Sequence, residues 1–135
     1  MKTKTELMSF SDGIDLESGD RLDTFELMVE SYGELNESKT NAVLVCHAFS
    51  GNHFAAGKND DGETGWWDQI IGPDKAIDTN KFFVICCNNL GGCSGSTGPK
   101  SINPKTNKAY GSSFPQVSVT DWVNSQKILM EKLNI

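Results

Sequence analysis

Two apolar runs constrain the fold of this chain more than any other feature of its sequence. The first is Asn41–Phe49 (NAVLVCHAF), which opens with nearly continuous apolar residues, and the second is Lys81–Leu90 (KFFVICCNNL). A strand with one face in water alternates polar and apolar residues, whereas a strand buried on both faces is marked by a continuous apolar run. Doubly buried strands are typical of parallel sheets. We therefore expect both runs to be buried strands of such a sheet.

The sequence before these runs predicts that the sheet begins antiparallel. Ile14–Leu16 and Arg21–Tyr32 flank the turn sequence Glu17–Asp20 (ESGD), and polar and apolar residues roughly alternate there. This pattern is typical of a β-hairpin, which we expect near the edge of the sheet. A sheet that begins antiparallel and turns parallel predicts an α/β fold, in a single domain over residues 1–135.

Loops and one helix are expected around and after the second run. Gly65–Ile71 (GWWDQII) predicts a short helical or irregular packing segment, and Gly91–Pro115, rich in glycine and proline, predicts a long loop. Ser118 and Asp121 fit the capping pattern of a helix over Val119–Leu133. Its apolar positions recur at helical spacing and predict one buried face, formed by Val119, Trp122, Val123, Leu129 and Leu133.

Composition and charge narrow the functional classes. Of the 135 residues, 37% are hydrophobic and 22% are charged, which is enough apolar material for a packed core. Twelve basic residues stand against eighteen acidic ones, and the net charge of -6 disfavours binding to nucleic-acid phosphates. Met1–Ser11 lacks the apolar segment of a signal peptide, and no later stretch is apolar enough to span a membrane. We therefore expect neither secretion nor a membrane partner.

The four cysteines predict a reducing compartment. Cys46, Cys86 and Cys87 lie in the apolar runs, where a thiol is usually a small buried hydrophobic side chain. No pair has the C-x-x-C spacing of a redox or zinc motif. Free buried thiols are typical of the cytoplasm, which is the expected location.

His47–Gly51 (HAFSG) directly follows the strand expected in the first run and is one candidate for catalysis. A loop at the end of a buried strand can point a backbone N–H at a developing negative charge, and such a donor is worth about 3 kcal/mol. A plain strand-to-loop turn explains the five residues equally well, with His47 as a structural histidine. The motif alone leaves both interpretations open.

Cys93 is a second candidate, because Gly91–Gly95 (GGCSG) has the spacing of a nucleophile elbow with cysteine in place of serine. An elbow turns directly into a helix, whereas this chain continues as Ser94–Pro99 (SGSTGP), which favours a loop or packing role. Only His47 and His53 could act as its base. These three side chains match no standard metal-site spacing, so no metal is expected. A G-x-S-x-G elbow and a Walker phosphate loop are both absent.

A longer set of matches resembles the homoserine O-acyltransferase family, which has the α/β-hydrolase fold. The matching segments are Asn41–Gly51, Gly65–Thr79 and Phe82–Pro104, followed by Tyr110–Gly111 and Phe114–Pro115. The run LGGCSGSTGPKSINP within them is more specific than any single motif. The resemblance extends from about Gly13 to Ile135 and covers about the first third of a family member. It implies the N-terminal part of an α/β-hydrolase fold, truncated before the nucleophile elbow.

The resemblance also implies a mechanism. In this family a serine at the elbow takes the acyl group from acyl-CoA and passes it to the hydroxyl of homoserine. That serine and the acid and histidine of its triad would all follow Ile135, so the resemblance implies that the chain alone is inactive. Phe49 matches the residue whose backbone N–H completes the oxyanion hole, and Ser50 and Gly51 match substrate-binding positions.

The substrates that the resemblance implies are L-homoserine and either succinyl-CoA or acetyl-CoA, with no further cofactor and a homodimer as the assembly. Asn88–Leu90, Gly51–Gly57 and Asp121–Trp122 look more like the succinyl-transferring branch, so succinyl-CoA is favoured. An acyl hydrolase or esterase of the same fold is an alternative, in which water replaces homoserine. A non-enzymatic binding module is the other alternative.

Overall fold

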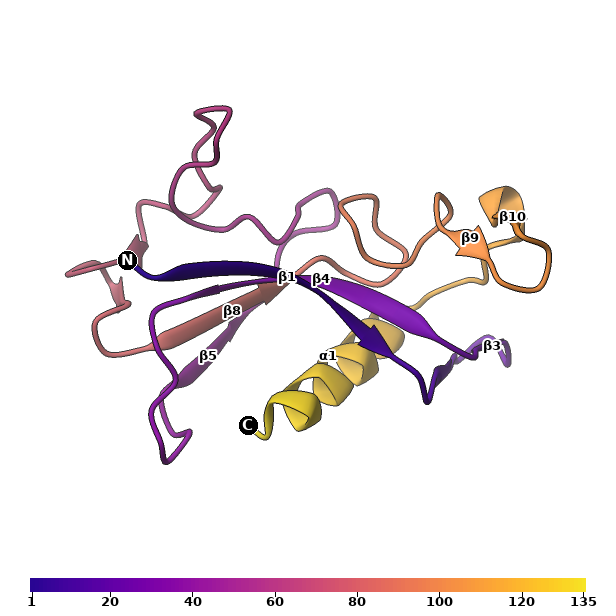
Figure 1. The fold of residues 1–135 in the computed structure, drawn as a ribbon, viewed down its shortest axis with the longest axis horizontal. Helices are drawn as coiled ribbons and strands as arrows, with labels where there is room; N and C mark the ends of the chain where they lie inside the picture. Colours follow the sequence, from indigo (N-terminus) through magenta and orange to yellow (C-terminus); the bar gives the residue numbers. More distant parts are fainter.

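The computed structural model describes residues 1–135 and contains a four-stranded sheet with one helix packed beneath it (Figure 1). The strands lie in the order β1 (Thr3–Phe10), β4 (Phe25–Tyr32), β8 (Phe83–Cys87) and β5 (Ala42–Val45). β4 pairs antiparallel with both β1 and β8, whereas β8 and β5 are parallel. The predicted change from antiparallel to parallel pairing is therefore confirmed, and it occurs at β8.

The N-terminal hairpin is longer than predicted. β2 (Ile14–Asp15) and β3 (Arg21–Leu22) pair around the expected turn, but they form only a short ribbon at the end of a larger hairpin. That larger hairpin consists of β1 and β4, which pair over all eight residues of each strand. The sequence pattern did not predict β1 because it is an edge strand whose side chains are mostly exposed on both faces, so no alternation marks it.

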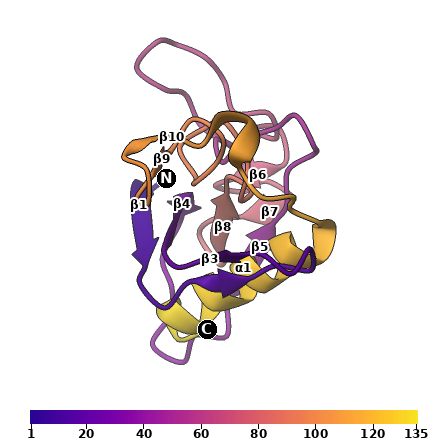
Figure 2. The ribbon, with the colours of Figure 1, turned by 90° about the vertical axis from the view of Figure 1, so that its right-hand side faces the viewer.

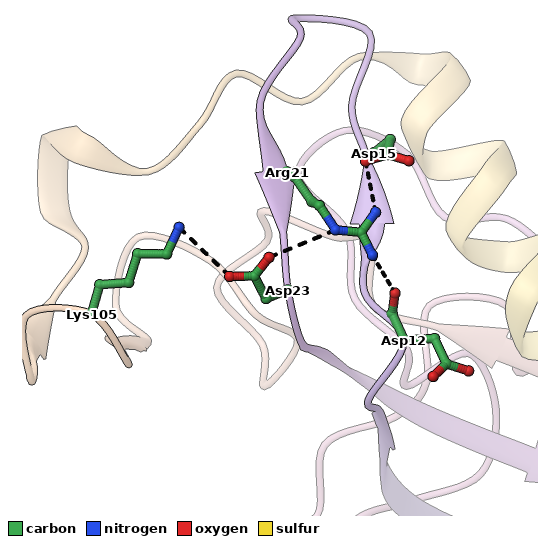
Figure 3. Close-up of polar contacts among 5 residues, drawn as sticks. All are labelled: Asp12, Asp15, Arg21, Asp23 and Lys105. Atoms are coloured by element: carbon green, nitrogen blue, oxygen red, sulfur yellow. Dashed lines mark hydrogen bonds and ion pairs between the residues drawn. The ribbon is translucent and has the colours of Figure 1, made fainter.

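Charged side chains surround the short β2–β3 ribbon (Figure 3). The Arg21 guanidinium lies 2.6 Å from the Asp15 carboxylate and 3.6 Å from that of Asp23, and it donates a further hydrogen bond to the Asp12 carbonyl. Asp23 also pairs with Lys105 at 3.6 Å, which links the ribbon to the long loop after β8. All these pairs are exposed, so each contributes about 0–1 kcal/mol. They orient the ribbon but do not form a core.

α1 begins and ends at the predicted residues, Val119–Leu133. The Ser118 hydroxyl accepts a hydrogen bond from the Asp121 N–H at 3.1 Å, and the Asp121 carboxylate accepts one from the Ser118 N–H at 2.8 Å. The other Asp121 oxygen accepts the Glu17 N–H at 3.0 Å, which ties the helix start to the β2–β3 turn. Asn134, in a left-handed conformation, ends the helix. Its bounds were predictable because both caps are local in sequence.

The buried face of α1 matches the predicted one only in part. Leu129 is fully buried, and Trp122 and Leu133 pack against the same core, as expected, but Val119 and Val123 are 68% and 58% exposed. The sheet instead covers a face whose other buried members are polar, namely Asp121, Ser125 and Gln126. Each of them has a hydrogen-bond partner: Asp121 bonds to the helix cap and to Glu17, the Ser125 hydroxyl donates to the Trp122 carbonyl within the helix, and Gln126 donates to Asn89. Both valines lie outside this contact.

β8 lies between two cores and is buried on both faces, as predicted. Ile85 and Cys87 belong to the core on the α1 side, together with Leu129. Val84 and Cys86 belong to a second core on the opposite face, under the loop that follows β5. Figure 2 shows this arrangement, with α1 on one side of the sheet and most of the loops on the other.

β5 corrects the prediction of a second doubly buried strand. The strand ends at Val45 and does not reach Phe49, and Val45 is its only buried residue. Leu44 is 37% exposed and the Cys46 thiol is also exposed, whereas burial had been predicted for both. The physical reason is that β5 is an edge strand that pairs with β8 alone.

The remaining elements are short and lie within the loops. They are β6 (Ile71–Gly72), β7 (Ile77–Asp78), β9 (Ile102–Asn103), β10 (Lys108–Ala109) and a 3₁₀ turn at Gly111–Ser113. β6 pairs with β7 in parallel, and β9 pairs with β10 antiparallel. Gly65–Ile71 consists mainly of turns, which agrees with the prediction of an irregular packing segment. None of the helices has the length and apolar character to cross a membrane.

Candidate functional site

The carboxyl ends of the parallel strands β5 and β8 open into a cavity of about 470 Å³. In α/β sheets ligands bind at this end of the strands. The cavity is lined by the loop after β5, the loop after β8 and the residues that lead into α1. Phe49, Ser50 and Gly51, the three residues predicted to form the site, all line it.

His47 is a buried histidine with both ring nitrogens engaged. Its Nδ1 lies 2.7 Å from the Ala48 carbonyl oxygen, and its Nε2 lies 3.1 Å from the backbone nitrogen of Asn89. A backbone N–H can only donate, so Nε2 accepts, and the proton of the neutral ring is on Nδ1, from which it is donated to Ala48. The lone pair of Nε2 is therefore occupied, and His47 is not a free base for Cys93.

The loop after β5 presents Phe49 at the cavity. The Gly51 N–H donates to the Ala48 carbonyl at 2.8 Å and closes a tight turn. The Phe49 side chain is 89% exposed, and its ring centroid lies 6.3 Å from that of Trp122. The Phe49 N–H donates no hydrogen bond within the chain. A free backbone donor at the carboxyl end of a parallel strand can stabilise a developing oxyanion.

The loop after β8 forms a closely bonded floor for the cavity. The Asn88 side-chain oxygen accepts the N–H groups of Ser94 and Ser96, at 3.1 and 3.4 Å. The Ser96 hydroxyl accepts the Met28 N–H at 3.0 Å, and the Thr97 hydroxyl accepts the Glu26 N–H at 2.8 Å. Residues 94–97 therefore run beside the first half of β4, at Glu26 and Met28, and continue the hydrogen bonding that β8 provides at Val29–Tyr32.

A glycine is required at position 95 for this arrangement. Gly95 has a φ of 107°, and a Cβ at this position would lie 2.7 Å from the Met28 side chain. The glycine-rich segment is therefore explained by its packing on β4. The sequence did not predict this because the partners of Ser96 and Thr97 lie about 70 residues earlier in the chain.

Cys93 is an exposed residue of the same loop and lines the cavity. The residues after it form bends and turns, and no helix follows, in contrast to a nucleophile elbow. The sulfur atom makes no hydrogen bond to a histidine or carboxylate. No arrangement that would activate the thiol is present, so a loop role for Cys93 stays the favoured prediction.

Two side chains of α1 for which the sequence predicted no role in the site make hydrogen bonds at the end of β8, and one of them, Trp122, lines the cavity. The Trp122 indole donates to the Leu90 carbonyl at 2.8 Å, and the Gln126 amide donates to the Asn89 side-chain oxygen at 3.3 Å. These bonds fix the helix against the end of β8. A polar residue in a helix is ordinarily assigned to the solvent side, so only the structure could reveal that Gln126 is buried.

His53 lies outside this cavity, on the side of the second core. The Tyr32 hydroxyl accepts the N–H groups of Ala55 and Ala56 at 2.8 and 3.0 Å, which packs the loop around His53 onto the sheet. Burial, and secondarily the proximity of His47, lowers the pKa of His53 below its ordinary value. The structure does not bring His53 to the lining of the site, and no group of three or more potential metal ligands forms in the chain.

Comparisons with known proteins identify relatives of the chain. No family model matches it. It is 58% identical over 132 residues to the homoserine O-succinyltransferase of Hahella chejuensis, covering 96% of this chain and 34% of the relative. It is 59% identical over 122 residues to that of Neisseria gonorrhoeae, covering 89% of this chain and 32% of the relative. The chain thus spans about a third of the length of the curated relatives that it matches.

Solved structures show the same fold. The chain superposes on homoserine O-acetyltransferase from Bacillus anthracis with a TM-score of 0.90 and 39% identity, covering 100% of this chain and 38% of that one. It superposes on esterase E22 with a TM-score of 0.89 and 40% identity, covering 99% of this chain and 38% of that one. The predicted α/β-hydrolase fold is therefore confirmed for the part that the chain represents.

Proposed function

The chain belongs to the homoserine O-acyltransferase family over the third of those proteins that it matches, and from this relationship we propose that it contributes to transfer of an acyl group from acyl-CoA to the hydroxyl of L-homoserine. The transfer requires the remaining two thirds of the relatives' length, and a protein with both parts is called the full-length protein below. The observation that carries the proposal is the 58% identity to a homoserine O-succinyltransferase over nearly the whole chain.

The role proposed for this chain is stabilisation of negative charge. When a nucleophile attacks the thioester carbonyl of acyl-CoA, the carbonyl oxygen becomes an oxyanion, and the C–S bond then breaks to release CoA as a thiol. The Phe49 N–H, free of partners at the cavity, supplies one hydrogen bond to that oxyanion. Ser50 and Gly51 line the same cavity and are proposed to contact the substrate. The nucleophilic serine, its histidine and its acid are assigned to the part outside this chain.

Succinyl-CoA is the proposed donor. Both curated relatives described above are named homoserine O-succinyltransferases, at 58% and 59% identity. The acetyltransferase from Bacillus anthracis is less similar, at 39% identity.

No cofactor beyond acyl-CoA as co-substrate is proposed. A homodimer is the proposed assembly. The cytoplasm is the proposed location, because all four cysteines are free thiols, as is typical of a reducing compartment.

The test is a donor and acceptor comparison with the full-length protein. Release of free CoA is followed with a thiol reagent, with succinyl-CoA or acetyl-CoA and with or without L-homoserine. The expected result is release that depends on homoserine, is faster with succinyl-CoA and yields O-succinylhomoserine by mass spectrometry. Preference for acetyl-CoA would leave the transferase assignment intact and overturn the donor assignment.

Ester hydrolysis is the second candidate function, because the chain is 40% identical to esterase E22 and superposes on it closely. The same cavity and the same backbone donor would serve a reaction in which water accepts the acyl group. CoA release at full rate without homoserine, or rapid cleavage of a simple ester with no transfer product, would establish this function and displace the transferase. The higher identity to the succinyltransferases makes acyl transfer the favoured proposal.

A further inference from the structure

We propose that His47 is a positioning residue that holds the Phe49 N–H in the orientation of an oxyanion donor. The inference rests on the acyl transfer proposed above and assigns a role to a side chain that makes no contact with the reacting atoms. Its basis is the geometry of a single peptide unit. The Ala48 carbonyl and the Phe49 N–H belong to the same planar trans peptide, so they point in opposite directions and rotate together.

The first contact of His47 acts on this peptide unit directly. Nδ1 lies 2.7 Å from the Ala48 carbonyl oxygen, and the Gly51 N–H donates to the same oxygen at 2.8 Å. With two donors on the carbonyl, the peptide plane is fixed. The Phe49 N–H on its opposite edge is then directed away from both donors and stays free of partners within the chain.

The second contact of His47 connects this peptide to the rest of the fold. Nε2 accepts the Asn89 N–H at 3.1 Å, just beyond the end of β8, and the Asn89 side chain in turn accepts a hydrogen bond from Gln126 of α1 at 3.3 Å. His47 as a residue is only 8% exposed, so water competes little for either bond. The imidazole is therefore a rigid link between the end of the central strand and the peptide that carries the donor.

Gly51 provides an independent observation for the same arrangement. A Cβ at this position would lie 2.9 Å from the His47 Cβ and 3.1 Å from its Nδ1, closer than side chains normally approach. The turn closes onto the imidazole only because residue 51 has no side chain. The sequence HAFSG thus has a steric as well as a hydrogen-bonding reason for pairing a histidine with a glycine four residues later.

Three substitutions of His47 in the full-length protein separate its two contacts. His47→Asn keeps a donor near the position of Nδ1, His47→Gln keeps an acceptor near the position of Nε2, and His47→Leu removes both. His47→Leu should lower kcat with succinyl-CoA by about 10- to 100-fold, because a misdirected oxyanion donor loses most of its effect. KM should change by less than about threefold, since the donor acts mainly in the transition state. His47→Asn should recover more of kcat than His47→Gln.

His53→Leu is the matched control, because His53 is a partly buried histidine that does not line the cavity. It should leave kcat unchanged. Amide hydrogen exchange provides a readout that needs no activity: His47→Leu should speed exchange at Asn89 and Gly51, and His53→Leu should not. If His47→Leu retains kcat within about twofold, or if the Asn89 and Gly51 amides exchange at the wild-type rate, the positioning role is overturned. If the wild-type full-length protein transfers no acyl group, and His47→Leu still speeds exchange at Asn89 and Gly51, the proposed function is overturned. The rigid link through His47 is then still supported.

Discussion

β8 and β5 are neighbouring parallel strands with similar apolar sequences, yet their surroundings differ. β8 has a hydrogen-bonded strand on each side and a core on each face, and four of its five residues are buried. β5 pairs only with β8 and buries one residue of four. The comparison shows that an apolar sequence makes a strand suitable for burial, whereas actual burial depends on the elements that pack beside it. The loops after the two strands also differ. The loop after β8 is held by hydrogen bonds among its own residues, whereas the loop after β5 leaves the Phe49 N–H without a partner.

The largest expected difference is in the cost of truncating one side chain in each strand. Ile85→Ala in β8 should lower the free energy of unfolding by about 2–5 kcal/mol, because the side chain is fully buried and a cavity remains. Leu44→Ala in β5 should cost about 1 kcal/mol or less, because 37% of the residue is already exposed. Urea denaturation of the 135-residue chain, followed by circular dichroism, measures both.

Equal losses for the two variants would contradict the burial difference between the strands. The same pair in the full-length protein sharpens the comparison. If further chain covers the open edge of β5, the cost of Leu44→Ala should rise toward that of Ile85→Ala, whereas the cost of Ile85→Ala should stay nearly constant.

The two loops can be compared through the Phe49 N–H. Phe49→Pro removes that backbone donor, whereas Phe49→Ala keeps it and removes only an exposed side chain. In the full-length protein Phe49→Pro should lower kcat/KM by about 100-fold or more, and Phe49→Ala by only a few-fold. Steady-state kinetics with succinyl-CoA and L-homoserine measures the effect. Thermal melting of both variants shows whether proline disturbs the fold. A similar loss of kcat/KM in both variants would show that the Phe49 side chain, and not its N–H, causes the effect.

How much of this molecule was predictable from sequence depends on how local its interactions are. The bounds of α1 were predictable because Ser118 and Asp121 cap it from within four residues. β8 was predictable because its neighbours all lie in this chain. β1 was not, because an edge strand exposed on both faces has no periodic signal. The exposure of Val123 was not predictable either, because it depends on how the buried polar residues orient the helix.

The candidate site likewise has features that the sequence predicted and features that depend on contacts with distant residues. The position of Phe49 was predicted from the family resemblance, because a plain strand-to-loop turn explained the local pattern His47–Gly51 equally well. The bonds that Ser96 and Thr97 make to β4, and the bond that Gln126 makes to Asn89, join residues that are distant in sequence. Hydroxyl or amide side chains in a loop or helix are indistinguishable in sequence from solvated ones.

A smaller effect is expected for a carboxyl group next to β8. Glu30 of β4 lies opposite Cys86 and is almost fully buried without a cationic partner. Burial raises the pKa of Glu30 to about 7 from its usual 4.5, and a hydrogen bond from Tyr32 only partly opposes this. Between these two values the folded chain keeps a proton that the unfolded chain has lost. The contribution of Glu30 to stability should therefore be greatest below about pH 4.5, fall as pH rises to about 7 and then level off.

Glu30→Gln tests this dependence, because the neutral amide cannot ionise. At pH 8 the variant should be more stable than the parent chain by on the order of 1–2 kcal/mol, a value reduced from the full shift because solvent screens part of it. Glu26→Gln, on the same strand and face but only partly buried, is the control. Urea denaturation at pH 5 and pH 8 gives the comparison. A variant no more stable than the parent at pH 8 would show that the Glu30 carboxyl ionises without cost in the folded state.

The smallest effect is expected at Cys93, in the loop after β8. The thiol is exposed at the cavity, no helix follows it, and the nearby His47 uses the Nε2 lone pair on the Asn89 N–H. Without a base, the thiol has no structural means of activation. Cys93→Ala in the full-length protein should therefore keep kcat/KM within about twofold of wild type, because only a small exposed side chain is lost. A thioester trapped on Cys93 by mass spectrometry after incubation with succinyl-CoA, together with an inactive but folded Cys93→Ala variant, would show that the loop after β8 carries the nucleophile. Catalysis would then depend on the loop after β8, to which only a packing role is assigned, and not only on the backbone donor in the loop after β5.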